Sequence, residues 1–543
     1  MNLTLSQLSE SANTLLQSGY QLPEYSLIDT RQKTSDAPVW VHFGVGNIFR
    51  AFPAAAAHTL LQKGLSDRGI IAVEGYDEEI VSKIYAPHDQ LSILVTLCAD
   101  GKLKKTVIGS VTESLVLDPA SAPDEFSRLK TIFQAPSLQL ATFTITEKGY
   151  QLSGADGTLF DAVAHDFQSG PDAPVSYPGK VAALLYARYQ AGALPVAMVS
   201  MDNCSQNGDR LFHAVAAFAD AWVQNGLAEP GFAAYLKDPE KVSFPWTMID
   251  KITPRPDDTV KAMLEKDGFT DMEPVITSKS TYIAPFVNAE ECEYLVLEDA
   301  FPNGHPPLEK AGFLFTDRET VQKTERMKVC TCLNPLHTAL AVFGCLLGYH
   351  RIFEEMDDPD LLCLIEALGW KEGMPVVTNP GILNPEEFLT DVLKKRLPNP
   401  FLPDTPQRIA TDTSQKLSVR FGQTILAWAK KDAASVKNLR AIPLVLAGWL
   451  RYLVGTEDSG QAFTPSPDPM LSELTLLLQR AADAAAANQA DEVMQLLTPL
   501  FLNTTVFGVD LVTVGLAKTV CSLFMEMCQA PGSVRKTLQR QLK

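Results

Sequence analysis

The chain has 543 residues, of which 46% are hydrophobic and 20% charged, and its formal net charge is −18 at pH 7. This length and apolar content are enough for two substantial hydrophobic cores. The acidic balance leaves no basic stripe to neutralise phosphates, which argues against nucleic acid as a partner, and it disfavours binding to an anionic membrane.

The amino-terminal stretch, residues 1–36, is predicted to be a helical lead-in closed by Pro23 and a polar stretch. Its first 30 residues contain no Lys or Arg, so they lack the charged region of a secretory signal and the arginines of a transit peptide. No uncharged apolar run reaches the roughly 18 residues that a membrane-spanning helix requires. The nine cysteines form no dense framework, which is typical of a reducing compartment, and we expect a cytoplasmic protein.

A strand, a glycine turn and a helix are predicted between Val41 and Leu61. Gly44 can adopt the positive φ of a tight turn, Gly46 lets the backbone approach a pyrophosphate, and the start of the helix supplies N–H donors. Phe49 stands where the usual GxGxxG motif has its third glycine, and a turn of this kind also occurs without a nucleotide. The predicted cofactor-binding residues of the turn are Gly44, Gly46, Asn47, Ile48, Phe49 and Arg50.

A second strand, Gly69 to Glu74, follows at the distance expected of a βαβ unit and ends in an acid. A carboxylate at this point can bind the adenosine ribose hydroxyls and repels the 2′-phosphate of NADP, so we expect NAD as the cofactor. Glu74 is the first candidate for this contact, and Asp77 is the alternative.

The remaining elements predict two domains. From Val39 to about Asp317, short apolar strands alternate with helices, which is typical of an α/β fold with a mainly parallel sheet. Beyond Asp317 the pattern is helical, including a helix over Met470 to Met494. We therefore expect a Rossmann-like domain over residues 1–317 and an all-α domain over residues 318–543, with the ligand site in the cleft between them.

The segment Lys328 to His337, KVCTCLNPLH, combines three side chains suited to the oxidation of an alcohol. Asn334 and His337 are three residues apart, so on a helix they share a face and can donate hydrogen bonds to one substrate oxygen. Lys328 can take the hydroxyl proton if its pKa falls from about 10.4 towards about 7 to 8. The alternative is an isolated lysine, a helix cap and a core histidine without catalytic function.

Lys328 fits this arrangement only if the helix is irregular. On an ideal helix it lies about 180° around the axis from His337. Pro335 lacks an N–H and its ring clashes with the carbonyl of Thr331, so a kink or a one-residue π-bulge is predicted. A bulge brings Lys328 to about 80° from His337, from which its long side chain can converge with the two donors.

Five motifs in order along the chain resemble those of the polyol-specific long-chain dehydrogenases, which include mannitol 2-dehydrogenase, fructuronate reductase and tagaturonate reductase. They are the glycine turn, 144–150 (TITEKGY), 200–203 (SMDN) with Asn207-Gly208, 244–254 (FPWTMIDKITP) and 408–416 (RIATDTSQK). In the fourth motif, Ile249 and Lys251 stand where the family usually has Val and Arg. The resemblance covers nearly the whole chain.

The resemblance implies a catalytic role for the matching residues of the Lys328 segment. Lys328 would be the general base, and Asn334 and His337 would stabilise the developing alkoxide. The family spaces its lysine five residues before the asparagine, whereas Lys328 precedes Asn334 by six. A π-bulge accommodates such a one-residue insertion.

Further roles are implied for residues outside that segment. Glu147 and Glu325 would relay the proton to solvent, and the substrate hydroxyls or a carboxylate would be held by Asn203, Asp250, Arg408 and Lys416. From the residues alone, Asp250 is equally suited to capping a turn, and Arg408 and Lys416 to a solvated helix face.

No metal is expected at the site. Cys330-x-Cys332 lacks the CxxC spacing of a metal knuckle, and the chain contains no HExxH motif. None of the 13 tyrosines has a lysine four residues later, which excludes the YxxxK site of short-chain dehydrogenases.

The sequence therefore predicts an NAD-dependent oxidoreductase that interconverts a secondary alcohol and a ketone on a sugar acid or a polyol. The cations available for a carboxylate are Lys148, Arg408, Lys416 and Arg420. The resemblance is closer to mannonate oxidoreductases, which favours D-mannonate and D-fructuronate over D-mannitol and D-fructose or tagaturonate. A non-catalytic NAD-binding regulatory protein is the alternative from another class, and the choice between monomer and homo-oligomer is open.

Overall fold

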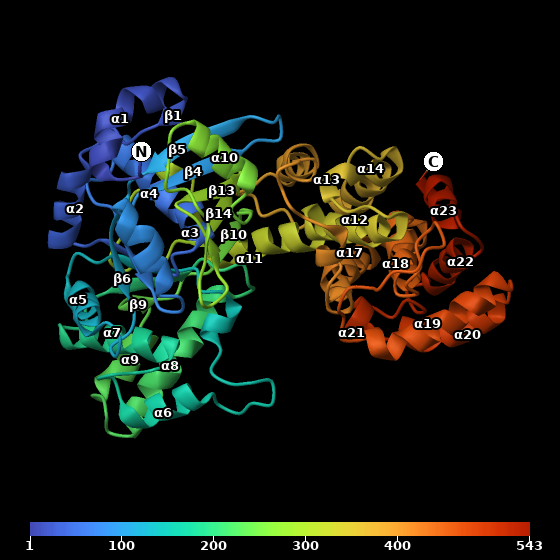
Figure 1. Ribbon diagram of the computed structural model, residues 1–543. Helices are drawn as coiled ribbons and strands as arrows, with labels where there is room; N and C mark the ends of the chain where they lie inside the picture. The colour runs from blue at the N-terminus through green and yellow to red at the C-terminus, as the bar shows by residue number, and fades with distance from the viewer. Residues whose placement is uncertain (543) are drawn as a thin grey trace. The chain divides into compact units, whose positions relative to one another are not determined.

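The computed structural model describes residues 1–542, and its chain divides into two compact units, residues 1–322 and 323–543. Figure 1 colours the first unit from blue to green and the second from yellow to red. The division falls inside helix α11 (Arg318–Met327).

The first unit contains a six-stranded sheet in which all neighbouring strands are parallel. Across the sheet the strands are β6 (Val111–Val116), β3 (Ile70–Glu74), β2 (Trp40–Phe43), β7 (Leu140–Phe143), β8 (Val196–Ser200) and β9 (Val242–Ser243). Numbered along the chain within this sheet, the order is 3-2-1-4-5-6, that of the doubly wound dinucleotide-binding fold. The direction of winding reverses between β2 and β7, where such folds bind their ligand.

Alternate residues of each central strand pack into two different cores, as the pleat of a buried strand requires. In β2, Val41 and Phe43 belong to one core and Trp40 to the other. The first core is completed by the apolar faces of α5 (Pro123–Gln134), α7 (Tyr177–Gln190), α8 (Asn207–Gln224) and α9 (Gly231–Lys237). Burial on both faces explains why these strands are continuous apolar runs.

The rest of the first unit consists of smaller sheets and short helices. A four-stranded mixed sheet has the order β1 (Tyr20–Gln21), β5 (Leu103–Ile108), β4 (Ser92–Leu97) and β13 (Phe286–Glu290). A three-stranded sheet has the order β10 (Thr247–Asp250), β14 (Tyr294–Glu298) and β15 (Leu314–Thr316), and β11 (Val275–Ile276) pairs with β12 (Tyr282–Ile283). The remaining α-helices are α1 (Leu5–Gln17), α2 (Leu27–Asp36), α3 (Asn47–Ala51), α4 (Pro53–Gln62), α6 (Asp161–Ser169) and α10 (Asp258–Lys266).

The second unit is helical, and in its described part the only β pairing is the isolated bridge between Thr456 and Ala462. Its α-helices are α12 (Asn334–Leu347), α13 (Ile352–Glu355), α14 (Pro359–Glu366), α15 (Pro385–Asp391), α16 (Pro406–Ile409), α17 (Gln423–Asp432), α18 (Ala441–Tyr452), α19 (Leu471–Ala486), α20 (Ala490–Phe501), α21 (Thr504–Phe507), α22 (Ala517–Met527) and α23 (Ser533–Leu542). Its π-helical segments are η5 (Lys328–Cys332), η6 (Ala367–Gly373), η8 (Val392–Arg396) and η10 (Ser418–Gly422). The predicted fold class is thus confirmed.

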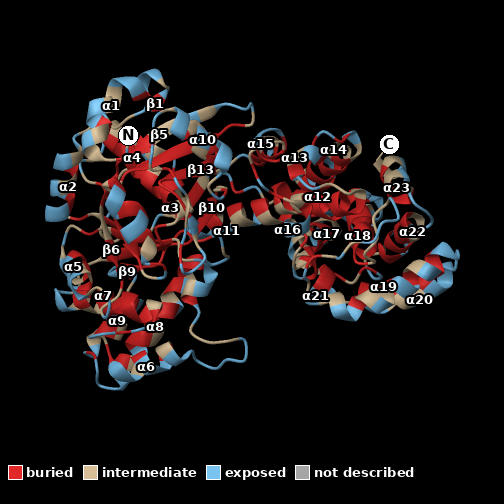
Figure 2. Ribbon diagram, viewed as in Figure 1, coloured by how far each residue is buried: buried red, intermediate tan, exposed pale blue. Residues whose placement is uncertain are grey.

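Helices α12 and α18 form the centre of the second unit, and nearly every residue of both is buried (Figure 2). The continuous helical stretch Arg318–Leu347 is long and apolar enough to span a membrane by composition alone, but 83% of its most apolar window is buried inside the protein. That burial is typical of a core helix.

Two predicted helices are each divided in the structure. The helix expected through Leu61 ends at Ala51, because Phe52 leaves the helical conformation (φ −130°) and Pro53 starts α4. The helix expected over Met470 to Met494 is the hairpin of α19 and α20, whose turn includes Asn488 at φ +57°. Asparagine is one of the few residues that tolerate this left-handed conformation, so it ends α19 without a glycine.

Candidate functional site

The glycine turn lies at the point where the sheet reverses its winding. Gly44 has φ +89°, and a Cβ on it would lie 2.2 Å from the carbonyl oxygen of Thr144 at the end of the neighbouring strand β7. Only glycine fits there. A Cβ on Gly46, in contrast, would have no heavy atom within 4 Å, so the chain leaves open space in front of this residue.

That space belongs to a cavity of about 570 Å³ in the first unit. Its walls come from the turns that follow β2, β3 and β7 and from the start of α7; among the lining residues are Gly44, Gly46, Glu74, Asp77, Thr146, Lys148, Gly149 and Tyr177. The cavity therefore lies at the carboxyl edge of the parallel strands, the usual place of a nucleotide in this fold.

Glu74 is buried, and both of its carboxylate oxygens accept hydrogen bonds from the backbone. Oε2 accepts from Val45 N at 3.0 Å, and Oε1 accepts from the N–H groups of Gly75, Tyr76 and Asp77 at 3.1, 2.9 and 3.1 Å. Burial raises the pKa of this carboxyl, and the four N–H donors act in the opposite direction. Glu74 thus ties the glycine turn to the turn that follows β3.

One carboxylate oxygen of Asp77 has no hydrogen-bond partner in the protein. The side chain is 2% exposed, its Oδ2 accepts from the hydroxyl of Thr277 at 2.6 Å, and its buried Oδ1 has no partner. A buried acceptor without a partner is costly, so its presence in a cavity wall points to a ligand hydroxyl. The space before Gly46 and this acceptor fit a dinucleotide with a free ribose hydroxyl.

The other residues of the turn occupy different positions from Gly44 and Gly46, and none of them lines the cavity. Phe49 is fully buried and stacks on His42 with ring centroids 4.2 Å apart. Arg50 is also fully buried and donates to the carbonyl of Ala284 at 2.6 Å and to Asn47 Oδ1 at 2.8 Å. Asn47 and Ile48 begin α3 and are partly exposed.

Asp202 was not assigned a role from the sequence, but it organises the cavity wall. Its carboxylate accepts from Ile145 N at 3.1 Å, from Thr146 N at 2.9 Å and from the hydroxyl of Tyr150 at 2.5 Å. Thr146 has φ +66°, a conformation that costs a β-branched residue about 1 to 3 kcal/mol. Asp202 follows β8 at the carboxyl edge of the sheet. An acid at that edge could have been predicted as a site residue from the sequence, because ligands of this fold bind there.

The Lys328 segment in the second unit forms the predicted bulge. Leu333 N donates to the carbonyl oxygen of Lys328 at 3.1 Å, a bond across five residues, and η5 is π-helical from Lys328 to Cys332. Lys328 is 2% exposed. After Leu333 (φ −129°), α12 begins with Asn334 and with Pro335 in its first turn, where a missing N–H has no cost.

His337 lies in the first turn of α12 and is half-buried. Burial lowers its pKa to about 4, and the positive charges of Arg396, Arg420 and Arg408 act in the same direction, whereas Asp404 opposes them. This shift favours the neutral imidazole at neutral pH.

Three arginines lie near enough to His337 to lower its pKa. Arg408 is exposed and pairs with buried Asp404, and Arg420 donates to the hydroxyl of Thr338 at 2.6 Å. Burial lowers the pKa of Lys416, and the charges of Arg420 and Arg408 add to this effect. Arg408, Lys416 and Arg420 are candidates from the sequence, and Arg396, which is 2% exposed, is a further cation that the sequence does not single out.

The predicted site residues divide between the units. The second unit holds Glu325, Lys328, Asn334, His337, Arg408 and Lys416. The first holds Glu147, which is exposed and paired with Arg210 at 2.8 Å, exposed Asn203, and Asp250, which is buried at the end of β10. Glu325, in α11, is partly exposed. Within residues 1–542, no three or more His, Cys, Asp or Glu side chains lie together as metal ligands would.

The strand order, the glycine turn at the winding reversal and the cavity beside it are the architecture of a dinucleotide-binding protein. Two family descriptions match the chain: the mannitol dehydrogenase Rossmann domain over residues 39–310 and the mannitol dehydrogenase C-terminal domain over residues 320–515. The chain belongs to the mannitol dehydrogenase family and is an oxidoreductase that acts on CH–OH groups. This confirms the resemblance found in the five motifs.

Three similar proteins illustrate the range of the family. A D-mannonate oxidoreductase of Thermotoga maritima is 50% identical over 96% of this chain and 95% of its own length. A polyol:NADP oxidoreductase of Gluconobacter oxydans is 30% identical over 83% of this chain and 87% of its own. The solved mannitol 2-dehydrogenase of Pseudomonas fluorescens, a ternary complex with NAD and D-mannitol, is 26% identical with a TM-score of 0.68 and covers 99% of both chains.

Proposed function

We propose that this protein oxidises D-mannonate to D-fructuronate, and reduces D-fructuronate in the reverse direction, with NAD(H) as the cofactor. The observation that carries this proposal is the 50% identity to a D-mannonate oxidoreductase over 96% of the chain. Mannitol with fructose, and tagaturonate, are the alternative substrates.

The cavity of the first unit supports NAD over NADP. Asp77 Oδ1, a buried acceptor without a partner, would bind an adenosine ribose hydroxyl, and the charge of Asp77 would repel a 2′-phosphate. Glu74 would contribute indirectly, since its oxygens are already engaged by four backbone N–H groups. The open face of Gly46 would accommodate the pyrophosphate.

NAD, held beside Gly46 and Asp77, would supply the hydride acceptor for the carbinol carbon. Lys328, in its neutral form, would take the hydroxyl proton, and Glu325 would pass that proton towards solvent. Asn334 and neutral His337 would donate hydrogen bonds to the developing alkoxide, contacts whose loss typically costs about 2.7 to 4 kcal/mol of barrier. No metal takes part in this proposal.

The cations around His337 support an acidic substrate. A carboxylate needs a cation at the far end of its pocket, and Arg396, Arg408, Lys416 and Arg420 all lie close enough to affect His337 or one another electrostatically. An uncharged polyol gains less from such a cluster. Asn203 and Asp250 would bind substrate hydroxyls, and Glu147 would extend the proton path, as the family resemblance implies.

The test is the oxidation of NADH by purified protein with D-fructuronate and, separately, with D-fructose. We expect turnover with fructuronate and a kcat/KM at least about 100-fold lower with fructose. Fructose has no carboxylate, so it loses charge-assisted hydrogen bonds worth about 3 kcal/mol. A preference for fructose would transfer the proposal to the mannitol reaction. No loss of NADH with any ketose or ketouronate would favour a non-catalytic NAD-binding protein. We also propose a cytoplasmic location, so the assay uses a reducing buffer.

A further inference from the structure

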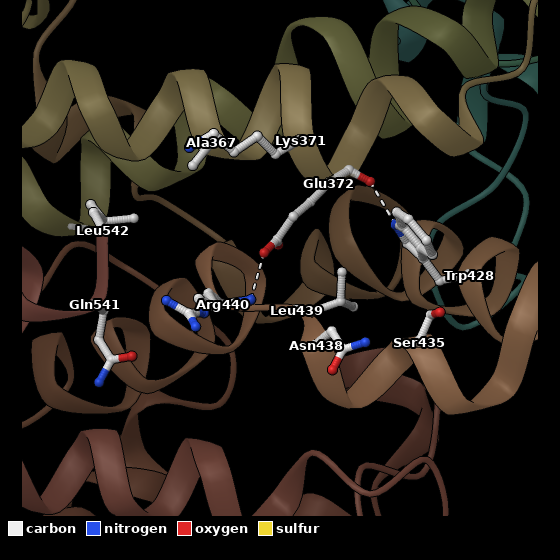
Figure 3. Close-up of a pocket in the computed structure, with 10 residues that line it drawn as sticks. All are labelled: Ala367, Lys371, Glu372, Trp428, Ser435, Asn438, Leu439, Arg440, Gln541 and Leu542. Atoms are coloured by element: carbon white, nitrogen blue, oxygen red, sulfur yellow. Dashed lines mark hydrogen bonds between the residues drawn. The ribbon is translucent and has the colours of Figure 1, made fainter.

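A second cavity, of about 370 Å³, lies in the helical unit, and none of the proposed catalytic or substrate-binding residues lines it (Figure 3). Its walls come from η6, α17, the segment that leads into α18, and the end of α23. The lining residues are Ala367, Lys371, Glu372, Trp428, Ser435, Asn438, Leu439, Arg440, Gln541 and Leu542.

The polar groups of this cavity favour an anion. Lys371 and Arg440 supply two positive charges, and Asn438, Ser435 and Gln541 supply neutral donors. Among the described lining residues, Glu372 alone carries a carboxylate. It is buried, and its oxygens already accept from the backbone N–H groups of Arg440, Ala441 and Ile442. The adjoining stretch 428–440 carries four cations and one acid, which is a positive segment in a chain of net charge −18. Oxyanions are the ligands that such a set recognises.

Glu372 also joins three walls of the cavity. Its carboxylate caps α18, and its carbonyl oxygen accepts from the indole N–H of Trp428 in α17 at 2.7 Å, as the dashed lines in Figure 3 show. A ligand held between Lys371 on η6 and Arg440 before α18 would therefore bridge elements that are already linked by one buried residue.

Two of these walls contact the π turn that carries Lys328. Gly373, the last residue of η6, packs so closely on Thr331 that a Cβ would lie 2.7 Å from its methyl group. From α17, the hydroxyl of Thr424 donates to the carbonyl of Cys330 at 2.9 Å. A shift of η6 or α17 thus acts directly on residues two and three positions from Lys328.

We propose that this cavity is an effector site for a small oxyanion, carrying a carboxylate or a phosphate, whose binding alters turnover through η6, α17 and the π turn. Binding of the oxyanion does not depend on the proposed reaction, whereas its effect on turnover rests on the proposed function. For binding to alter turnover, the ligand would have to favour one position of η6 over another, and the turnover experiment tests this.

The binding experiment titrates inorganic phosphate, and separately citrate, into the wild-type chain and into Lys371→Ala/Arg440→Ala, followed by Trp fluorescence and melting temperature at fixed ionic strength. We expect one site per chain, a fluorescence change that is absent in Trp428→Phe, and affinity lost at least about tenfold in the double variant. Lys437→Ala removes one charge of the same segment from a residue that does not line the cavity. Its affinity for the probe should stay within about twofold of the wild type. Binding of only one of the two probes identifies the phosphate or the carboxylate class.

The turnover experiment repeats the titration at saturating NADH and substrate. We expect kcat to change at least about twofold in the wild type and to stay constant in the double variant. Equal titrations of wild type and double variant would overturn the proposed site, as would no binding of either probe. Binding without an effect on kcat would overturn the regulatory part, and an enzyme inactive with every substrate would instead refute the proposed function.

Discussion

Leu333 donates its backbone N–H to the carbonyl oxygen of Lys328, and this bond across five residues is the structural basis of the proposed mechanism. An α-helical turn at this point would set Lys328 about 180° from His337, whereas one inserted residue reduces the angle to about 80°. The bulge therefore makes the six-residue spacing from Lys328 to Asn334 compatible with a lysine, an asparagine and a histidine that act on one oxygen.

Asp77 should determine the choice of cofactor. In Asp77→Ala the ribose hydroxyl loses a charged acceptor, so KM for NADH should rise about tenfold or more and the preference for NADH over NADPH should narrow. The measurement is kcat/KM with each cofactor. Glu78→Ala, an exposed neighbour outside the cavity lining, serves as the control. An unchanged cofactor preference in Asp77→Ala would assign the contact to another residue.

Asp202 should act as a positioning residue for the cofactor cavity. Asp202→Asn keeps the size of the side chain but removes the charged acceptor of Ile145 N and Thr146 N, so the strained conformation at Thr146 relaxes. We expect KM for NADH to rise about tenfold while kcat changes little. Asp220→Asn, an exposed residue paired with Lys237, is the matched control. A fall in kcat at constant KM would disagree with this role.

Glu355 should destabilise the helical unit at alkaline pH. It is fully buried against Gly344, and neither carboxylate oxygen has a partner. Burial raises its pKa well above the usual value, and the charges of Asp358 and Glu354 add to this effect. Because the pKa of Glu355 is higher in the folded than in the unfolded protein, the unfolded state loses its proton first as pH rises. The stability that the protonated carboxyl provides is therefore present below the unfolded pKa of about 4.3 and is lost as pH rises towards the folded pKa.

Replacement of this acid by an apolar residue should therefore stabilise the protein more at pH 8 than at pH 5. We expect Glu355→Met to raise the free energy of unfolding by about 2 kcal/mol at pH 8, as measured by urea denaturation, and by much less at pH 5. Glu366→Met removes an exposed acid from α14, one that does not act on Glu355, and should show no such pH dependence. Equal effects of the two substitutions would mean that Glu355 is solvated.

Chelation should leave the reaction unaffected. The proposed mechanism assigns the proton to Lys328 and the alkoxide to Asn334 and His337, so incubation with EDTA followed by desalting should leave kcat within about twofold. The measurement is the rate of NADH oxidation before and after treatment. In a second experiment, Zn²⁺ or Mg²⁺ is added to the treated protein and the rate is measured again. A loss that added metal restores would place a metal in the reaction.

The features predictable from the sequence are those that local chemistry dictates. The strand into Gly44 follows from an apolar run and a glycine pair, and the bulge follows from Pro335 and from the lysine spacing. The roles of Glu74 and Asp77 are not separable from the sequence, because both are acids at the carboxyl end of β3. Only the fold shows that backbone N–H groups occupy the oxygens of Glu74. Asp202 accepts hydrogen bonds from residues distant in sequence, and the charge of Arg396 lowers the pKa of a distant histidine; no local pattern reveals either relationship.

The most direct test of the mechanism is the turnover of Lys328→Ala with NADH and D-fructuronate, together with NADH binding measured by fluorescence. We expect kcat to fall at least about 100-fold, as loss of a general acid–base group requires, with partial recovery on addition of methylamine. NADH affinity should be unchanged, and Arg326→Ala, an exposed cation two residues away, should retain turnover. Turnover of Lys328→Ala close to that of the wild type would show that another group carries the proton.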